Sequence, residues 1–98
     1  MYLKKATVLR PDDGFILDSL GWIYFKMKKY DEAARYLEEA VTLVGDDSTI
    51  VEHLGDVYAA RKEYKKALKT YRKAQEIDPE RKDLQDKIRR IKGEPAER

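Results

Sequence analysis

The chain has 98 residues, enough for one small domain, with 42% hydrophobic and 41% charged residues and a formal net charge of +2. This composition is too apolar for a disordered chain, and no apolar run reaches the ~18 residues that a membrane-spanning helix needs, so we expect no membrane insertion. The absence of cysteine suits the cytoplasm, which we take as the default compartment, and is equally compatible with a bacterial periplasm.

Five segments carry apolar residues at helical spacing, with breaks between them that contain proline, glycine or aspartate. In the first segment, Ile16, Leu20, Ile23 and Met27 are spaced by four, three and four residues, which places them on one helix face. Short turns inside the first two pairs of segments indicate antiparallel hairpins. No strand is expected. The spacing predicts helices over residues 14–27, 31–43, 48–61, 65–77 and 81–92.

Two signals mark helix ends. Residues 46–49, DDST, supply side-chain oxygens that can cap the third helix, and Thr49 followed by Glu52 predicts a capping box there. Gly93 and Pro95 should end the last helix.

A period of 34 residues relates residues 14–47 to residues 48–81. Glycine inside a helix costs about 1 kcal/mol relative to alanine, so Gly21 and Gly55 should each lie at a close contact between helices. We expect small residues on the facing helix, such as Ala33, to let the two backbones approach. The two units are identical at Ile16/Ile50, Leu20/Leu54, Gly21/Gly55, Tyr24/Tyr58, Lys28/Lys62, Tyr30/Tyr64, Ala33/Ala67 and Ala40/Ala74.

These positions resemble the tetratricopeptide repeat family, whose helical hairpin carries a bulky residue, Leu-Gly, Tyr, Ala, an aromatic residue, Ala and Pro in that order. The first unit matches at Leu17, Leu20-Gly21, Tyr24, Ala33, Leu37, Ala40 and Gly45, and the second at Val51, Leu54-Gly55, Tyr58, Ala67, Tyr71, Ala74 and Pro79. Leu17 and Val51 replace the usual Trp, Leu37 replaces the aromatic residue, and Gly45 replaces the Pro. The resemblance implies an all-α fold, a right-handed α-solenoid of antiparallel helix hairpins.

The resemblance also divides the chain. Residues 14–47 and 48–81 form two full units, residues 82–92 a capping helix, and residues 93–98 a flexible tail. Residues 1–13 align with the second half of a unit through Leu3, Ala6 and Leu9, so we interpret them as the second helix of a preceding partial repeat, in a fragment of a longer array. We expect a short sixth helix over residues 2–9, and the alternative is that it is an ordinary N-terminal helix and not part of a repeat. The segments DSLGW and EHLGDVY look closest to bacterial members of the family.

Residues suited to catalysis or metal binding are sparse. His53 is the single histidine, and the glycines occur singly, so the sequence predicts no zinc site, no phosphate-binding loop, no cofactor and no enzyme. The basic run at residues 61–66, RKEYKK, is interpreted as a solvated helix face. A nucleic-acid surface would need a longer basic stripe with base-stacking aromatic residues, so no nucleic-acid partner is expected.

In this family the first helix of each unit lines a concave groove that holds an extended peptide or a partner helix. The resemblance therefore implies a non-catalytic protein–protein interaction module. Aromatic anchors beside carboxylates suit a partner with apolar and basic side chains. The predicted partner-binding residues are Phe15, Asp18, Ser19, Trp22, Phe25, Lys26, Glu52, His53 and Asp56.

Other interpretations of the groove stay open. The aromatic residues of the first unit could pack on a preceding unit instead, and the chain could be a structural spacer, or a homodimer through exposed repeat ends. Asp18 and Trp22 stand where family members that grip a C-terminal carboxylate have Lys and Asn. We therefore expect no binding of acidic chaperone tails.

Overall fold

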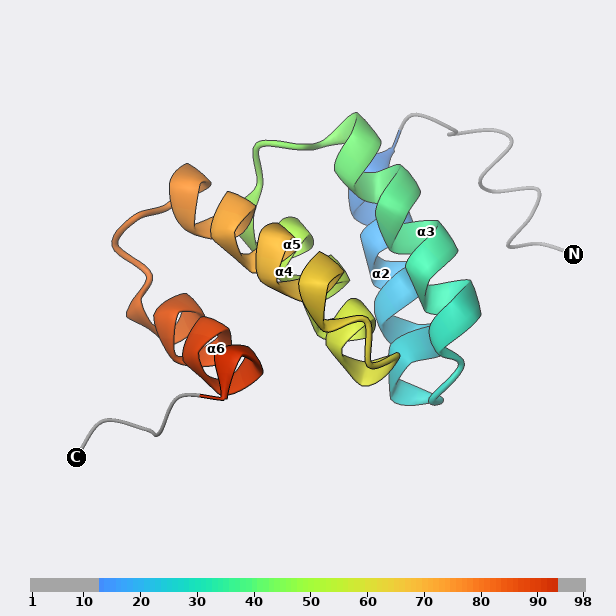
Figure 1. Cartoon of the computed structure of the whole chain (residues 1–98). Coiled ribbons are helices and arrows are strands. Elements are labelled where there is room, and N and C mark those ends of the chain that lie inside the picture. The colour runs from blue at the N-terminus through green and yellow to red at the C-terminus, as the bar shows by residue number, and fades with distance from the viewer. Residues whose placement is uncertain (1–12, 94–98) are drawn as a thin grey trace, which may run out of the picture.

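The computed structural model describes residues 13–93, and within them the chain forms five helices and no strand (Figure 1). The predicted all-α fold is confirmed, and every predicted helix end agrees with the structure to within one residue. The helix expected over residues 2–9, and the tail after Gly93, lie outside the described residues. The helices are α2 (Gly14–Lys26), α3 (Tyr30–Leu43), α4 (Ser48–Ala60), α5 (Tyr64–Ile77) and α6 (Lys82–Lys92).

The first helix of each unit begins at an aspartate cap. The Asp13 carboxylate accepts a hydrogen bond from the backbone N–H of Ile16, and the Asp47 carboxylate accepts one from Ile50 at 3.1 Å. The capping box predicted from Thr49 and Glu52 is wrong. Asp47 already satisfies the first free N–H groups of α4, and the Glu52 carboxylate binds side chains of the next unit.

The turn inside each hairpin has the same backbone geometry. Lys28 and Lys62 adopt left-handed conformations, with φ of 63° and 64°. In the first turn the N–H of Lys29 donates to the carbonyl of Tyr24 at 2.9 Å, and the second turn repeats this bond 34 residues later. This is the hydrogen-bond pattern of a Schellman motif, in which the left-handed position is normally glycine.

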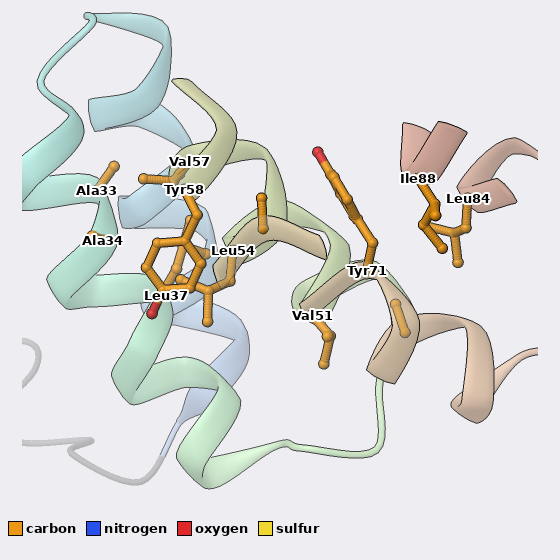
Figure 2. Packing of buried hydrophobic residues seen from close by; sticks show 12 residues of the cluster. Ala33, Ala34, Leu37, Val51, Leu54, Val57, Tyr58, Tyr71, Leu84 and Ile88 are labelled. Carbon is orange, nitrogen blue, oxygen red and sulfur yellow. The ribbon is translucent and has the colours of Figure 1, made fainter. Parts of the chain in front are cut away.

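The hairpins stack in chain order, as Figure 1 shows. Helix α2 packs along α3, α4 along α5, and α4 also contacts both helices of the first hairpin, while α6 packs on α5. One continuous apolar core runs through these contacts from α3 to α6 (Figure 2). Its buried residues include Ala33, Leu37, Val51, Leu54, Val57, Tyr71, Leu84 and Ile88. Because each unit buries its apolar face against the next, the fold is the predicted helical repeat solenoid.

The glycines of the Leu-Gly pairs make room for a large side chain. A Cβ atom on Gly21 would lie 2.6 Å from Cγ of Leu37 and 3.3 Å from the carbonyl oxygen of Ala33, and one on Gly55 would lie 2.7 Å from the ring of Tyr71. The expected close contact is therefore present. Its nearest partner is the bulky residue of the facing helix, because Leu37 and Tyr71 occupy the space that a Cβ would need.

Replacing Gly21 by valine should lower the free energy of unfolding by about 1–3 kcal/mol, because the added methyl groups overpack the contact with Leu37. Urea denaturation followed by circular dichroism would measure this loss. Ser19→Val, at an exposed position of the same helix, is the matched control and should change stability by less than about 0.5 kcal/mol. Equal effects of the two substitutions would contradict the packing argument.

Replacing Lys28 by glycine should stabilise the protein, because a left-handed conformation costs a non-glycine residue about 1–2 kcal/mol. The greater freedom of glycine in the unfolded chain offsets part of this gain, which leaves about 0.5–1 kcal/mol. The same change at Lys29, which has a negative φ, should not stabilise it. Thermal melting of the wild type and both variants would measure these effects. A melting temperature for Lys28→Gly below that of the wild type would refute this reasoning.

Candidate functional site

The residues predicted to bind a partner lie on α2 and α4, and the structure joins the two helices through their side chains. The carboxylate of Asp18 lies 2.8 Å from Nδ1 of His53. The ring of Trp22 is stacked on the imidazole of His53, with the ring centroids 4.2 Å apart. These contacts link the first helices of successive units.

Three rings form a continuous stack on this face. Trp22 lies between His53 and Phe25, whose ring centroid is 4.7 Å from that of Trp22 with 17° between the planes. The ammonium of Lys26 lies 6.0 Å from the Trp22 ring, at the outer limit of a cation–π contact. Trp22 therefore packs on the following unit, whereas the sequence had left open that it packs on a preceding one.

Three of the predicted residues of α2 are exposed. Phe15, about two turns before Trp22, is 58% exposed, and Ser19 between them is also exposed. Lys26, the third, is exposed at the C-terminal end of α2 beside the Trp22 ring, so exposed residues flank a stack whose members are half-buried.

The predicted carboxylates of α4 are already occupied. Glu52 is only 8% exposed, and its two oxygens accept hydrogen bonds of 2.6 Å from Arg81 and from Lys87. Lys87 also donates to Asp56 at 2.9 Å, and Asp56 accepts a further hydrogen bond from the hydroxyl of Tyr71. The negative charge predicted for this part of the groove is thus largely neutralised within the chain.

These bonds shift the ionisation of the groups that make them. Burial opposes the charge of Glu52, but hydrogen bonds from Lys87 and Arg81 outweigh it and lower the pKa of Glu52. Burial likewise opposes the charge of Lys87, but hydrogen bonds to Glu52 and Asp56 outweigh it and raise the pKa of Lys87. Burial and the bond to Asp56 raise the pKa of Tyr71. All of these groups keep their ordinary charges at neutral pH.

The contacts between the first helices repeat with the period of the sequence. Asp18 and Trp22 of α2 both contact His53 of α4. Thirty-four residues later, Glu52 and Asp56 of α4 both contact Lys87 of α6. We call these two sets of contacts the first and second junctions. An aromatic ring meets an imidazole in the first, and a carboxylate meets an ammonium in the second.

Arg81 and Lys87 are not among the predicted partner-binding residues, although both reach this surface. A signal for Lys87 was present, because it follows Glu52 by 35 residues, the separation that also joins Asp18 to His53. Nothing in the sequence pattern singled out Arg81, which approaches Glu52 from the turn between α5 and α6 and also binds Asp83.

Other kinds of site find little support in the described residues. Within residues 13–93, no three His, Asp or Glu side chains come together in a group that could hold a metal ion. In the same part of the chain, no helix has the length and apolar character needed to cross a bilayer.

The sequence model of a protein family described as Tetratricopeptide repeat matches residues 19–82. The chain belongs to the tetratricopeptide repeat family. The predicted family and fold are therefore confirmed. No curated protein has a sequence that matches the chain.

Solved tetratricopeptide repeat structures have the same fold. The first such domain of human RPAP3 is 21% identical, with a TM-score of 0.85 over 93% of this chain and 72% of that one. The first domain of Spaghetti (RPAP3), bound to the HSP90 peptide SRMEEVD, gives 21% identity and a TM-score of 0.84, with 93% and 74% covered. MamA 41-end from Desulfovibrio magneticus RS-1 gives 24% and 0.84, and this chain spans about half of that chain (93% and 51% covered). The bacterial origin suggested by the sequence stays a prediction.

Replacing Lys87 by methionine should destabilise the protein by about 1–3 kcal/mol at pH 7, because it leaves two partly buried carboxylates short of a donor. The lowered pKa of Glu52 means that this bond stabilises the fold above the usual carboxylate pKa and is lost as pH falls through the folded-state value. The wild type and the variant should therefore converge in stability as pH falls from the usual carboxylate range through the lowered pKa of Glu52.

Urea denaturation at a series of pH values would measure this convergence. Lys82→Met is the control, since Lys82 is exposed on the same helix. Parallel stability curves for wild type and Lys87→Met across the acid range would show that the second junction contributes no ionic stabilisation.

Proposed function

We propose that this chain is a non-catalytic module that binds a peptide or helix of a partner protein on the face formed by α2 and α4. The observation that carries the proposal is the stack of Phe25, Trp22 and His53, with the exposed ring of Phe15 beside it. Rings already held by their neighbours lose little conformational freedom when a ligand covers them, which makes them efficient anchors.

The chemistry of this face favours apolar and basic side chains in the partner. Apolar groups can cover the ring of Phe15 and the outer surface of the stack, and the ammonium of Lys26, 6.0 Å from the Trp22 ring, shows that a cation is accommodated beside the stack. The carboxylates attract basic side chains of a partner less than the sequence suggested. Glu52 and Asp56 are bound to Lys87, and Asp18 is bound to His53. Stacking is therefore the main proposed source of affinity, and charge sets the preference.

The peptides bound by related structures have the opposite charge. Domains of RPAP3 were solved with the HSP90 peptide SRMEEVD and the HSP70 peptide SGPTIEEVD, both of which end in acidic residues. Here the cations Arg81 and Lys87 beside the proposed face are already bound to Glu52, so they are not available to receive such a terminus. We propose that this chain does not bind acidic chaperone tails there.

A second candidate function, self-association or spacing within a longer array, rests on another face of α2. Ile23 and Met27 are 55% and 53% exposed, whereas Val57, which corresponds to Ile23 in the second unit, is fully buried in the core cluster that includes α3 residues. In a continuous array of units, a helix of the preceding unit would cover the face of α2 that carries Ile23 and Met27. This comparison supports the proposed unit boundaries at residues 14–47 and 48–81, the capping helix at 82–92, and a preceding partial repeat at residues 1–13.

Selection of a random peptide library on the purified chain would test the proposed function. The selected peptides should be rich in apolar and basic residues, and Trp22→Ala should lower their affinity by about tenfold or more. Tyr64→Ala, at an exposed aromatic outside the proposed face, is the matched control and should leave affinity unchanged.

Light scattering of the same variants would separate the two candidate functions. Selected peptides with acidic C-termini, or equal affinity for wild type and Trp22→Ala, would refute the proposed binding face. A concentration-dependent dimer that Ile23→Ser abolishes, together with no selected peptide, would favour self-association.

A further inference from the structure

A groove of about 610 Å³ lies between α3 and α5, the second helices of the two hairpins. Its floor is formed by Val51, Leu54 and Tyr58 of α4, and Val41 of α3 and Leu68 of α5 add apolar groups to its walls. Figure 1 shows α3 and α5 on the same side of α4. We call this feature the α3–α5 groove, and its volume lies in the range of sites that hold small ligands or short peptide segments.

The α3–α5 groove and the proposed partner-binding face lie on opposite faces of α4. By helical spacing, the floor residues Leu54 and Tyr58 point away from Glu52 and Asp56, which line the proposed face. A ligand in the groove would therefore contact a different set of side chains from a ligand on the Trp22 stack.

One wall of the groove is strongly basic. Four cationic residues of α5 line it. Glu76 is the only acidic residue among the lining residues, and the carboxylate of Glu38 on α3 accepts a hydrogen bond from the floor residue Tyr58. None of the four makes an ion pair with another residue in the range 13–93, in contrast to Arg81 and Lys87, which are bound to carboxylates. The four residues are Lys65, Lys69, Arg72 and Lys73.

The fold itself does not require this charge. The residues at the corresponding positions of α3, 34 residues earlier, are mostly acidic, although α3 forms the same helix in the same kind of hairpin. Because one unit carries anions at these positions and the other carries cations, the sign of the charge does not decide whether the helix folds. The charge on α5 is therefore available for recognition. The corresponding residues of α3 are Asp31, Arg35, Glu38 and Glu39.

We propose that the α3–α5 groove binds an acidic segment of a partner protein, with apolar side chains of that segment over the floor and its carboxylates against the α5 wall. Charge complementarity supports an anionic ligand, and the apolar floor supports one that also carries hydrophobic groups. This is a second interaction surface, with a preference opposite to that of the proposed partner-binding face.

The shape of the groove favours a peptide over other anions. Its floor residues are buried between two helices, where a flat bilayer surface cannot reach them, whereas a narrow peptide segment can. The aromatic residue of the floor, Tyr58, is also buried, and its hydroxyl donates to Glu38 at 2.5 Å, so its ring is not placed to stack with a nucleic-acid base.

Fluorescence anisotropy with a labelled synthetic twelve-residue peptide would test the proposal. The peptide contains leucines at helical spacing separated by glutamates, and a counterpart carries lysines in place of the glutamates. The acidic peptide should bind with an affinity that falls as salt rises, and the basic counterpart should not bind at the groove. Amide NMR shifts should change around Val41, Leu68 and Lys69 and not around Trp22.

The chain offers matched variants for this experiment. Arg72→Glu with Lys73→Glu installs the residue type that α3 carries at the same positions, and it should weaken binding at least about tenfold. Lys29→Glu with Lys82→Glu changes the charge equally at exposed positions outside the groove, and it should change affinity less than about twofold. Circular dichroism and melting of both double variants would verify that they fold.

Several results would overturn the proposal. These are no binding of the acidic peptide, equal binding to the Arg72→Glu, Lys73→Glu variant when that variant is folded, and NMR shifts confined to the Trp22 stack. Capture by vesicles of phosphatidylserine and phosphatidylcholine without peptide binding would assign the basic wall to a membrane surface instead. Dimerisation lost in the same variant, again without peptide binding, would assign it to a second copy of this chain.

Discussion

The contact between a helix glycine and a large side chain of the facing helix sets the geometry of each hairpin. Gly21 lies against Leu37, and Gly55 lies against the ring of Tyr71. The missing Cβ lets the bulky residue enter the space between the helices, so that the first helix of each unit comes close to the second. In the second unit this contact also serves a polar purpose, because the Tyr71 ring extends far enough to place its hydroxyl on Asp56.

That placement connects the core to the surface on which we propose binding. Asp56, held by Tyr71, and Glu52 together receive Lys87 from α6, and this second junction fixes the last helix to the array. In the first unit the side chains change together: Leu37 has no hydroxyl, Trp22 takes the place of Asp56, and His53 takes the place of Lys87. The same positions therefore hold neighbouring units together, by ring stacking and the Asp18–His53 contact in the first junction and by charge in the second. What remains for a ligand is the outer surface of the stack and the exposed ring of Phe15.

The two faces of α4 give the molecule two different surfaces. The face toward α2 and α6 carries rings and internally neutralised carboxylates, whereas the face toward α3 and α5 has an apolar floor and a wall of cations without ion-pair partners in the range 13–93. A single short helix, α4, lies between them and packs against α2, α3 and α5. The two proposed sites together would let the module hold two segments of opposite charge at once, because neither surface uses the side chains of the other.

The sequence by itself determined the helices, the turns and the family, because these depend on local spacing and on a period that both units repeat. It placed every helix end to within one residue, and it located the Leu-Gly contacts, although it did not identify Leu37 and Tyr71 as their partners. Only the tertiary structure decided how the charges of the surface are used. From the sequence, Glu52 was interpreted as a free carboxylate of the groove and as one half of a capping box. In the structure, the ammonium of Lys87 on α6 lies 2.6 Å from its carboxylate. Such pairs depend on how neighbouring helices cross and which rotamers they allow, and neither quantity is encoded in the local pattern of residues.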